Sequence, residues 1–193
     1  LQKLILNNLI LNSNDIEQIC QNGETLQILS LERCDLDSRH RTELIPKLIS
    51  KCPLLTELNM NMSVRSHTKG CKILNDQQLC AIIDNMTPNI LKLKFGSQFN
   101  LRDHHVDALV QRCIKITELN LYDTSITNDS VSIVRNLKFL EKLSIGRNNI
   151  SFSTLLELKS VPTLKFLNYS SYYNRELEKI ENLKLYLPHI TIN

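Results

Sequence analysis

The residue types in this chain that could bind a metal or carry out catalysis are chiefly five histidines and six cysteines. Two of the histidines are adjacent, since His104 and His105 directly follow Asp103. They lack the H-E-x-x-H spacing that places two imidazoles on one helical face around zinc. We therefore expect them to lie at the start of a helix, in a surface or capping role.

The six cysteines contain no C-x-x-C pair, so they do not predict a zinc site. Most of them fall at apolar-periodic positions, where a free cysteine behaves as a small buried hydrophobic residue. Reduced thiols favour a cytoplasmic or nuclear location. Five N-x-S/T sequons would instead suit an extracellular receptor fragment, although a chain rich in Asn, Ser and Thr produces several by chance. The cysteines are Cys20, Cys34, Cys52, Cys71, Cys80 and Cys113.

The sequence does not contain the common catalytic motifs. There is no G-x-S-x-G, P-loop or G-x-G-x-x-G, and four glycines leave little scope for a phosphate-binding loop. The formal net charge is only +3, and Lys and Arg are scattered rather than gathered into a run. We therefore expect no enzymatic activity and no cofactor or metal, and neither nucleic acid nor membrane as a partner.

A short apolar pattern recurs along the chain and predicts the elements that position these residues. The pattern is apolar-x-x-apolar-x-apolar, and its alternation is typical of a strand. Its intervals run from 23 to 35 residues, mostly within the range of about 20 to 29 residues that is typical of leucine-rich repeats. The eight matches are "LQKLIL" from Leu1, "LQILSL" from Leu26, "LTELNM" from Leu55, "ILKLKF" from Ile90, "ITELNL" from Ile116, "LEKLSI" from Leu140, "LKFLNY" from Leu164 and "LPHITI" from Leu187.

Each strand pattern is followed by an apolar spacing that predicts a helix. Counted from the apolar residue that closes the repeat signature, further apolar residues fall at +5 and +8, as Val131 and Val134 do after Ile126. In the second repeat the +5 position is basic, so its helix is expected nearer Leu44 and Leu48. Residue types that can cap a helix N-terminus stand at +2. These predicted caps are Ser13, Ser38, Asp76, Asp103 and Asn128.

A strand followed by a helix, repeated eight times, predicts an α/β leucine-rich-repeat solenoid. Stacking the units pairs the strands in parallel and packs each helix against its neighbours, which gives a horseshoe with a concave parallel sheet and outer helices. Residues 1–193 are expected to form a single repeat domain, as a fragment of a longer chain. Residues 60–73 are expected to form an insertion loop, and residues 164–193 an atypical capping repeat.

Two segments, "KCPLLTEL" (51–58) and "RCIKITEL" (112–119), place a cysteine three positions before the apolar residue that opens the next strand. Together with "ITND" and "LRDHHVDALVQRC", they resemble the cysteine-containing repeat subclass found in F-box/leucine-rich-repeat proteins. The resemblance covers residues 26–158. It implies a substrate receptor of a cullin-type ubiquitin ligase. No segment here resembles the F-box that docks the ligase adaptor, so the resemblance implies that an F-box precedes Leu1.

Strand residues between the inward apolar positions are expected to point away from the core, onto the concave face. They are polar, small and rich in amides, which suits a protein segment better than an apolar small molecule. Tyr122, with Arg147 beside it, is the predicted anchor, because Tyr and Arg are enriched among binding hot spots. Alternatively, these are solvated strand residues. The predicted partner-binding residues of this face are Asn59, Asn61, Lys94, Asn120, Tyr122, Ser144, Arg147 and Asn168.

The insertion "MNMSVRSHTKGCKI" (60–73) is basic and has no acidic residue. Insertions within a solenoid repeat map to loops on one face, often the binding face. Arg65, His67, Lys69 and Lys72 are therefore predicted to contact an acidic partner. A tolerated surface insertion is the alternative.

Together these features predict a non-catalytic protein-protein recognition module, the substrate-binding repeat domain of an F-box-type ubiquitin-ligase receptor. The protein partner would lie on the concave face, and the ligase adaptor would be reached through the F-box. The alternative is a scaffold or regulatory repeat protein that inhibits or localises its target without any role in ubiquitin transfer.

Overall fold

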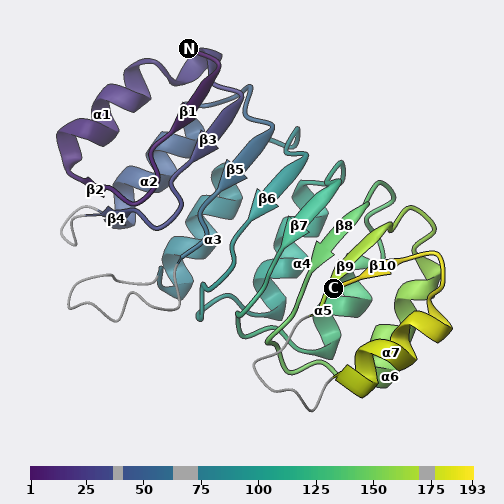
Figure 1. Cartoon of the computed structure of the whole chain (residues 1–193). Coiled ribbons are helices and arrows are strands. Elements are labelled where there is room, and N and C mark those ends of the chain that lie inside the picture. Colours follow the sequence, from purple (N-terminus) through teal and green to yellow (C-terminus); the bar gives the residue numbers. More distant parts are fainter. Residues whose placement is uncertain (37–40, 63–73, 170–176) are drawn as a thin grey trace.

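The chain forms two layers, one of short strands and one of helices, stacked repeat upon repeat (Figure 1). The computed structural model describes residues 1–36, 41–62, 74–169 and 177–193. Among these residues, no helix has the length and apolar character needed to cross a membrane.

Eight of the strands form one parallel sheet in the order β1-β3-β5-β6-β7-β8-β9-β10, as the repeat pattern predicts. A second parallel pair, β2 (Ile10–Leu11) with β4 (Asp35–Leu36), forms a separate small sheet. The strands of the large sheet are β1 (Lys3–Ile5), β3 (Ile28–Ser30), β5 (Glu57–Asn59), β6 (Lys92–Lys94), β7 (Glu118–Asn120), β8 (Lys142–Ser144), β9 (Phe166–Asn168) and β10 (Thr191–Ile192).

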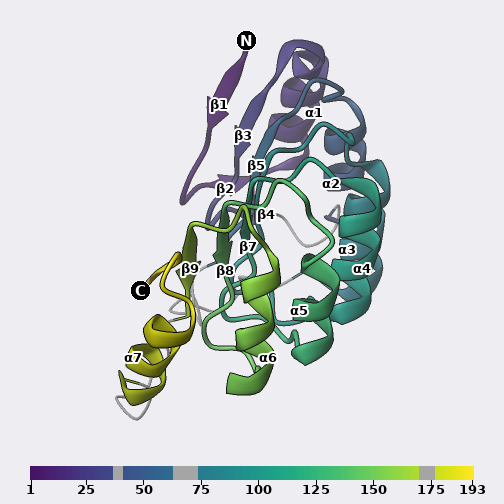
Figure 2. The same cartoon turned by 90° about the vertical axis from the view of Figure 1, so that its right-hand side faces the viewer.

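Helices α1 to α6 lie on one face of the large sheet, and the opposite face has no described helix over it (Figure 2). Helix α7 contacts α6 and β10 at the C-terminal end of the stack. The helices are α1 (Ser13–Gln21), α2 (Arg41–Ser50), α3 (Asp76–Asn85), α4 (Asp103–Arg112), α5 (Asn128–Val134), α6 (Phe152–Leu156) and α7 (Leu177–Tyr186), with 3-10 turns η1 (Gly23–Thr25) and η2 (Glu157–Ser160). In α2, Leu48 is fully buried and Leu44 packs against the core, so both predicted residues face the sheet, while the residues just before Arg41 lie outside the described part of the chain.

The middle residue of each strand points into the core and stands in register with the middle residue of the next. This ladder includes Leu29, Leu58, Leu93, Leu119 and Leu143, each at most 1% exposed. Cys52 and Cys113 are also completely buried, which confirms that they occupy core positions. Burial raises the pKa of both thiols to about 11, so they stay protonated at neutral pH.

The predicted start of the last repeat at Leu187 is wrong. In the sheet it is Ile192, not Ile190, that pairs with Leu167. The Ile190 N–H donates to the Leu187 carbonyl, as the Ile116 N–H donates to the Cys113 carbonyl. Leu187 therefore takes the cysteine position, and the strand opens at Ile190. The error arose because Leu187, Ile190 and Ile192 have the same spacing as Leu164, Leu167 and Tyr169 of the preceding repeat, although the strands do not pair in that alignment.

The Asn/Cys position of the repeat signature joins adjacent repeats by hydrogen bonds. The Asn148 amide donates to the Leu121 and Ile145 carbonyls, and its oxygen accepts the Thr124 N–H at 3.0 Å. The Thr124 hydroxyl in turn donates to the Leu121 carbonyl. These contacts satisfy backbone groups that the short strands leave unpaired.

Gln98 fills the same position in the fourth repeat, which the sequence pattern did not indicate. Its buried side chain donates to the Met60 carbonyl at 2.9 Å and accepts the Leu74 N–H at 3.4 Å. Asn100 adds a hydrogen bond to the Leu74 carbonyl at 2.8 Å. The fourth repeat thus holds both ends of the predicted insertion. The remainder of the insertion, residues 63–73, lies outside the described residues.

The predicted helix caps are wrong by one position. The side chains of Asn12, Asn75, Thr127 and Ser151 cap α1, α3, α5 and α6, each directly after the closing apolar residue. Asp76, Asp103 and Asn128 are instead the first residues of their helices, and predicted cap Ser38 lies outside the described residues.

The first residue of a helix reaches across to the next repeat instead. The Asn128 side chain accepts the Ser151 N–H at 2.8 Å. The half-buried Asp103 carboxylate accepts the N–H groups of Thr127 and Ser130, at 2.9 and 3.2 Å, and both of their hydroxyls. Burial favours a higher pKa for this carboxyl group, but the hydrogen bonds from Ser130 and Thr127 outweigh it and hold the pKa of Asp103 below its usual value.

Replacing Asp103 tests this contact between repeats. We expect Asp103→Ala to lower the free energy of unfolding by about 2 kcal/mol, because hydrogen bonds to a charged group are lost. Asp84→Ala, at the exposed end of α3, serves as the control and should change it by less than about 0.5 kcal/mol. The measurement is denaturant unfolding.

The free energy of unfolding should depend on pH differently in the wild type and in Asp103→Ala. Because the folded-state pKa of Asp103 lies below the ordinary value of 3.8, its stabilisation is present above that pH. It is lost as the pH falls through the folded-state pKa. A stability difference between wild type and Asp103→Ala that stays constant down to the lowest pH would contradict this role.

Candidate functional site

The face of the large sheet that carries no described helix is called here the strand face. Its central column is in register across neighbouring strands and contains Asn59, Lys94, Asn120, Ser144 and Asn168. All five are half-buried. The structure therefore brings these five predicted residues together on one surface, as expected from strand alternation.

A second column on the same face was missed, although the same alternation could have indicated it. It consists of the residue before each buried leucine, in the register Glu57, Lys92, Glu118, Lys142 and Phe166. The Lys92 ammonium lies 2.6 Å from the Glu57 carboxylate, and this hydrogen bond is the main reason that the pKa of Lys92 is raised. The Lys142 ammonium lies 5.7 Å from the centre of the Phe166 ring. Opposite charges thus alternate along this column.

Glu118 joins the two columns. One of its carboxylate oxygens lies 3.0 Å from the Lys94 ammonium and the other 3.8 Å from that of Lys142. The cations of the central strands are therefore matched by acidic neighbours rather than gathered into one basic track.

The predicted asparagines hold the backbone where the chain leaves the strands. Asn120 accepts the Tyr122 N–H at 2.9 Å, and Asn59 accepts the Asn61 N–H at 3.1 Å. The Asn59 amide also donates to Glu32, and Asn61 accepts the Gly96 N–H at 2.7 Å. Their oxygens are thus engaged within the chain, which reduces the acceptor capacity that the sequence suggested for a partner.

Tyr122 and Arg147 lie together, as predicted. The Arg147 guanidinium carbon is 5.1 Å from the centre of the Tyr122 ring, which is cation-π geometry. Both side chains are half-buried. Arg147 has φ 60°, and Asp123, in the equivalent turn of the preceding repeat, has φ 57°. This left-handed turn conformation follows each of these strands and directs the chain from the sheet toward the helix layer.

The strand face is hollowed toward its N-terminal half. The hollow has a volume of about 220 Å³, and its walls include Ser30, Asn59 and Lys94. It adjoins the ion pair of Lys92 with Glu57. A depression of this size suits one or two side chains of a partner rather than a whole small-molecule ligand, for which a pocket typically exceeds about 300 Å³.

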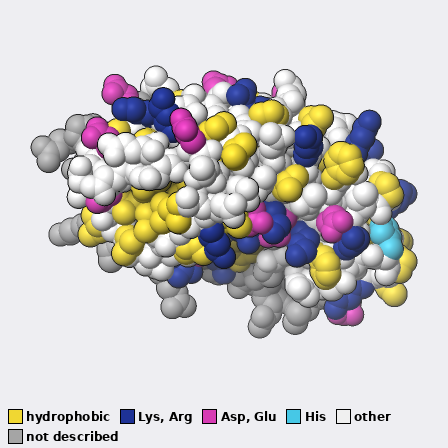
Figure 3. Space-filling view, turned by 90° about the horizontal axis from the view of Figure 1, so that it is seen from above, with side chains coloured by type: hydrophobic (Ala, Val, Ile, Leu, Met, Phe, Trp, Pro, Cys, Tyr) yellow, Lys and Arg dark blue, Asp and Glu magenta, His cyan; other side chains and the backbone are white. Residues whose placement is uncertain are grey.

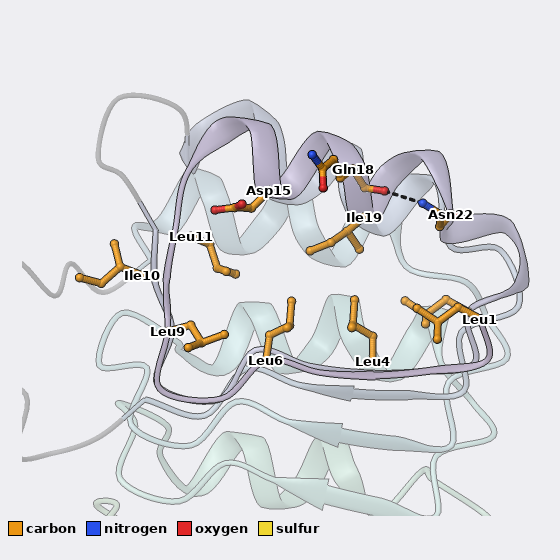
Figure 4. A pocket seen from close by; sticks show the side chains of 11 residues that line it. Leu1, Leu4, Leu6, Leu9, Ile10, Leu11, Asp15, Gln18, Ile19 and Asn22 are labelled. Carbon is orange, nitrogen blue, oxygen red and sulfur yellow. Dashed lines mark hydrogen bonds between the residues drawn. The ribbon is translucent and has the colours of Figure 1, made fainter.

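A larger apolar groove lies between α1 and β1, and Figure 4 shows Leu4, Leu6 and Leu9 facing Leu11 and Ile19 across it. Its volume is about 640 Å³. Hydrophobic side chains gather at this end of the molecule in Figure 3. Ile10 is 81% exposed. The groove is the open end of the repeat stack, where the first repeat has no described neighbour beyond β1.

The helix layer contains one cluster of potential metal ligands among the described residues. It brings Asp76 and Cys80 of α3 together with His104 and His105 of α4. His105 accepts the Arg102 N–H, which confirms its predicted capping role, but it is buried rather than at the surface. The sequence did not indicate this cluster because its members come from different repeats. The predicted partner contacts Arg65, His67, Lys69 and Lys72 lie outside the described residues.

Two solved structures show what the chain is similar to. Internalin C2 from Listeria monocytogenes superimposes with a TM-score of 0.56 and 17% identity, over 98% of this chain and 69% of that chain. TLR13, solved in a complex with ssRNA13, gives a TM-score of 0.57 and 18% identity, over 89% of this chain and 26% of that chain. No family model and no curated protein matches the sequence. These likenesses establish the fold, an α/β leucine-rich-repeat solenoid.

Gly96 tests how tightly the centre of the strand face is packed. A Cβ atom there would lie 3.0 Å from the Asn61 oxygen and 3.1 Å from the Asn120 oxygen. We expect Gly96→Ala to lower the free energy of unfolding by about 1–2 kcal/mol, because it displaces two hydrogen-bonded side chains. Denaturant unfolding measures the change. In an Asn120→Ala background the cost of Gly96→Ala should be smaller, and equal costs in both backgrounds would contradict the packing argument.

Proposed function

We propose that this chain is a protein-binding module whose strand face holds a segment of a partner protein. The observation that carries this proposal is the adjacency of Tyr122 and Arg147, at 5.1 Å, beside a sheet face that no described helix covers. An aromatic ring and a guanidinium already held together lose little conformational freedom when a partner covers them.

The charge pattern supports a protein partner. Glu57, Lys92, Glu118 and Lys142 alternate in sign along neighbouring strands. Binding to nucleic acid depends on cations that face successive phosphates, whereas here the cations face carboxylates. A partner segment with both acidic and basic side chains could exchange these ion pairs at little cost, since exposed pairs contribute only about 0–1 kcal/mol.

The narrower proposal is that the module captures substrates for a cullin-type ubiquitin ligase in the cytoplasm or nucleus. What supports it is the resemblance of the cysteine-containing repeats, in which Cys52 and Cys113 take the same buried position before a strand. The alternative role is a scaffold or regulatory protein that binds its target through the same face. The two differ in whether a ligase adaptor accompanies the module.

Partner capture with matched variants tests the binding face. A partner cross-linked to the wild-type chain should bind at least about 30-fold more weakly to Tyr122→Ala/Arg147→Ala, which removes the proposed hot spot. The control is Tyr186→Ala/Lys115→Ala, which removes one aromatic ring and one positive charge from exposed sites on α7 and after α4. Calorimetric titration with the purified partner gives the affinities. Equal losses in both double variants, or capture of RNA alone, would refute the proposal.

Co-purification tests the narrower proposal. The full-length protein from its source cells should retain a ligase adaptor, and the level of its captured partner should rise when cullin-dependent ubiquitin transfer is inhibited. If the partner is captured through the strand face but no adaptor accompanies it, the scaffold role holds instead.

A further inference from the structure

We propose that Asp76, Cys80 and His104 bind a single zinc ion in the helix layer, where α3 packs against α4. This site is independent of partner binding on the strand face, because it lies among the helices on the other face of the sheet (Figure 2).

The separations between the side-chain atoms fit a tetrahedral ion. One potential ligand atom from each of Asp76, Cys80, His104 and His105 lies within 4.8 Å of all the others. The His104 Nε2 atom is 3.1 Å from the Asp76 Oδ1 atom. Around zinc, with bonds of about 2.0–2.3 Å, neighbouring ligand atoms lie about 3.3–3.7 Å apart. Small side-chain rotations are therefore enough to bring the three ligands onto one ion.

The backbone already positions these ligands. Asp76 and Cys80 are four residues apart on α3, so they share one face of that helix. His104 is the second residue of α4, and α3 and α4 pack against each other. All three ligands thus come from helices rather than from loops, which limits the conformational freedom that binding must remove.

His105 supports the site without binding the ion. The Arg102 N–H donates to His105 Nδ1 at 3.1 Å, so that nitrogen carries no proton in the neutral ring. The proton is then on Nε2, which lies 3.4 Å from both the carboxylate and the carbonyl oxygen of Asp76. Direct ligation through Nε2 would move the proton to Nδ1 and leave the Arg102 N–H without its acceptor. His105 is therefore a positioning residue that orients the Asp76 carboxylate.

The set of ligands selects the metal. A thiolate, an imidazole and a carboxylate together suit zinc, whereas calcium and magnesium prefer sites made of oxygen atoms. Three protein ligands leave the fourth tetrahedral position to water, and Asp76 and His104 are exposed enough for solvent to reach it. Zinc bound there would tie the third repeat to the fourth. Its ligand Asp76 lies three residues after the end of the predicted insertion, residues 60–73.

Zinc titration of the purified, reduced chain tests this assignment. One equivalent of Zn²⁺ should bind in competition with a chromophoric chelator, and the melting temperature should rise by about 5–10 °C at a hundredfold excess over Kd. Co²⁺ should give a thiolate-to-metal charge-transfer band together with the visible absorption of a tetrahedral ion. The cobalt spectrum of the wild type needs no variant, so it tests the site even where a substitution impairs folding.

Matched variants identify the ligands. Cys80→Ser should abolish the charge-transfer band, and His104→Ala should weaken zinc binding by about a hundredfold or more. Cys20→Ser and His189→Ala replace the same residue types outside the cluster and should leave binding unchanged. The assignment is overturned if no zinc binds. It is also overturned if binding survives both Cys80→Ser and His104→Ala, or if it is lost in Cys71→Ser instead.

Discussion

The structure depends on one constraint: a strand of two or three residues cannot satisfy its own backbone. Each strand of the large sheet bonds to a parallel neighbour, and the buried residue at its centre, such as Leu93 between Leu58 and Leu119, packs only because those neighbours share its register. No repeat is expected to be stable alone, because its strand hydrogen bonds and much of its apolar contact are made with the neighbouring repeats. The register between strands therefore sets the position of every described side chain on the strand face.

Side chains extend the same dependence beyond the strands. Asn148 bonds to backbone groups of the preceding repeat, and Asp103 and Asn128 each reach the start of the following helix. At the equivalent place in the third repeat, Asp76 faces His104 and His105. A position that elsewhere joins two repeats through a hydroxyl or an amide N–H is here occupied by groups that can share a metal ion. The proposed zinc site is thus a chemical variant of a contact that the solenoid repeats.

Much of the fold could be predicted from the sequence, because burial imposes a period on it. The apolar-x-x-apolar-x-apolar spacing of Ile116, Leu119 and Leu121 predicts a strand, and all three are buried. The same logic failed at Leu187, because Leu187, Ile190 and Ile192 repeat the apolar spacing of Leu164, Leu167 and Tyr169, whereas the strands pair Ile192 with Leu167. It also could not find Gln98, whose role as a replacement for Asn or Cys depends on backbone groups more than 20 residues away.

For the candidate sites, alternation placed Asn120 and Lys94 correctly, but the pairing of Glu118 with Lys94 required the register between strands.

The contacts of Gln98 and Asn100 have a consequence for how this solenoid can change. Gln98 and Asn100 of the fourth repeat hydrogen-bond to both Met60 and Leu74. Side chains of that repeat therefore fix the position of α3 relative to β5, whatever the number of residues that join them. Changes in the length or sequence of the segment between Met60 and Leu74 would therefore leave the pairing of the strands intact. A new binding specificity in that segment would not require any change in the rest of the solenoid.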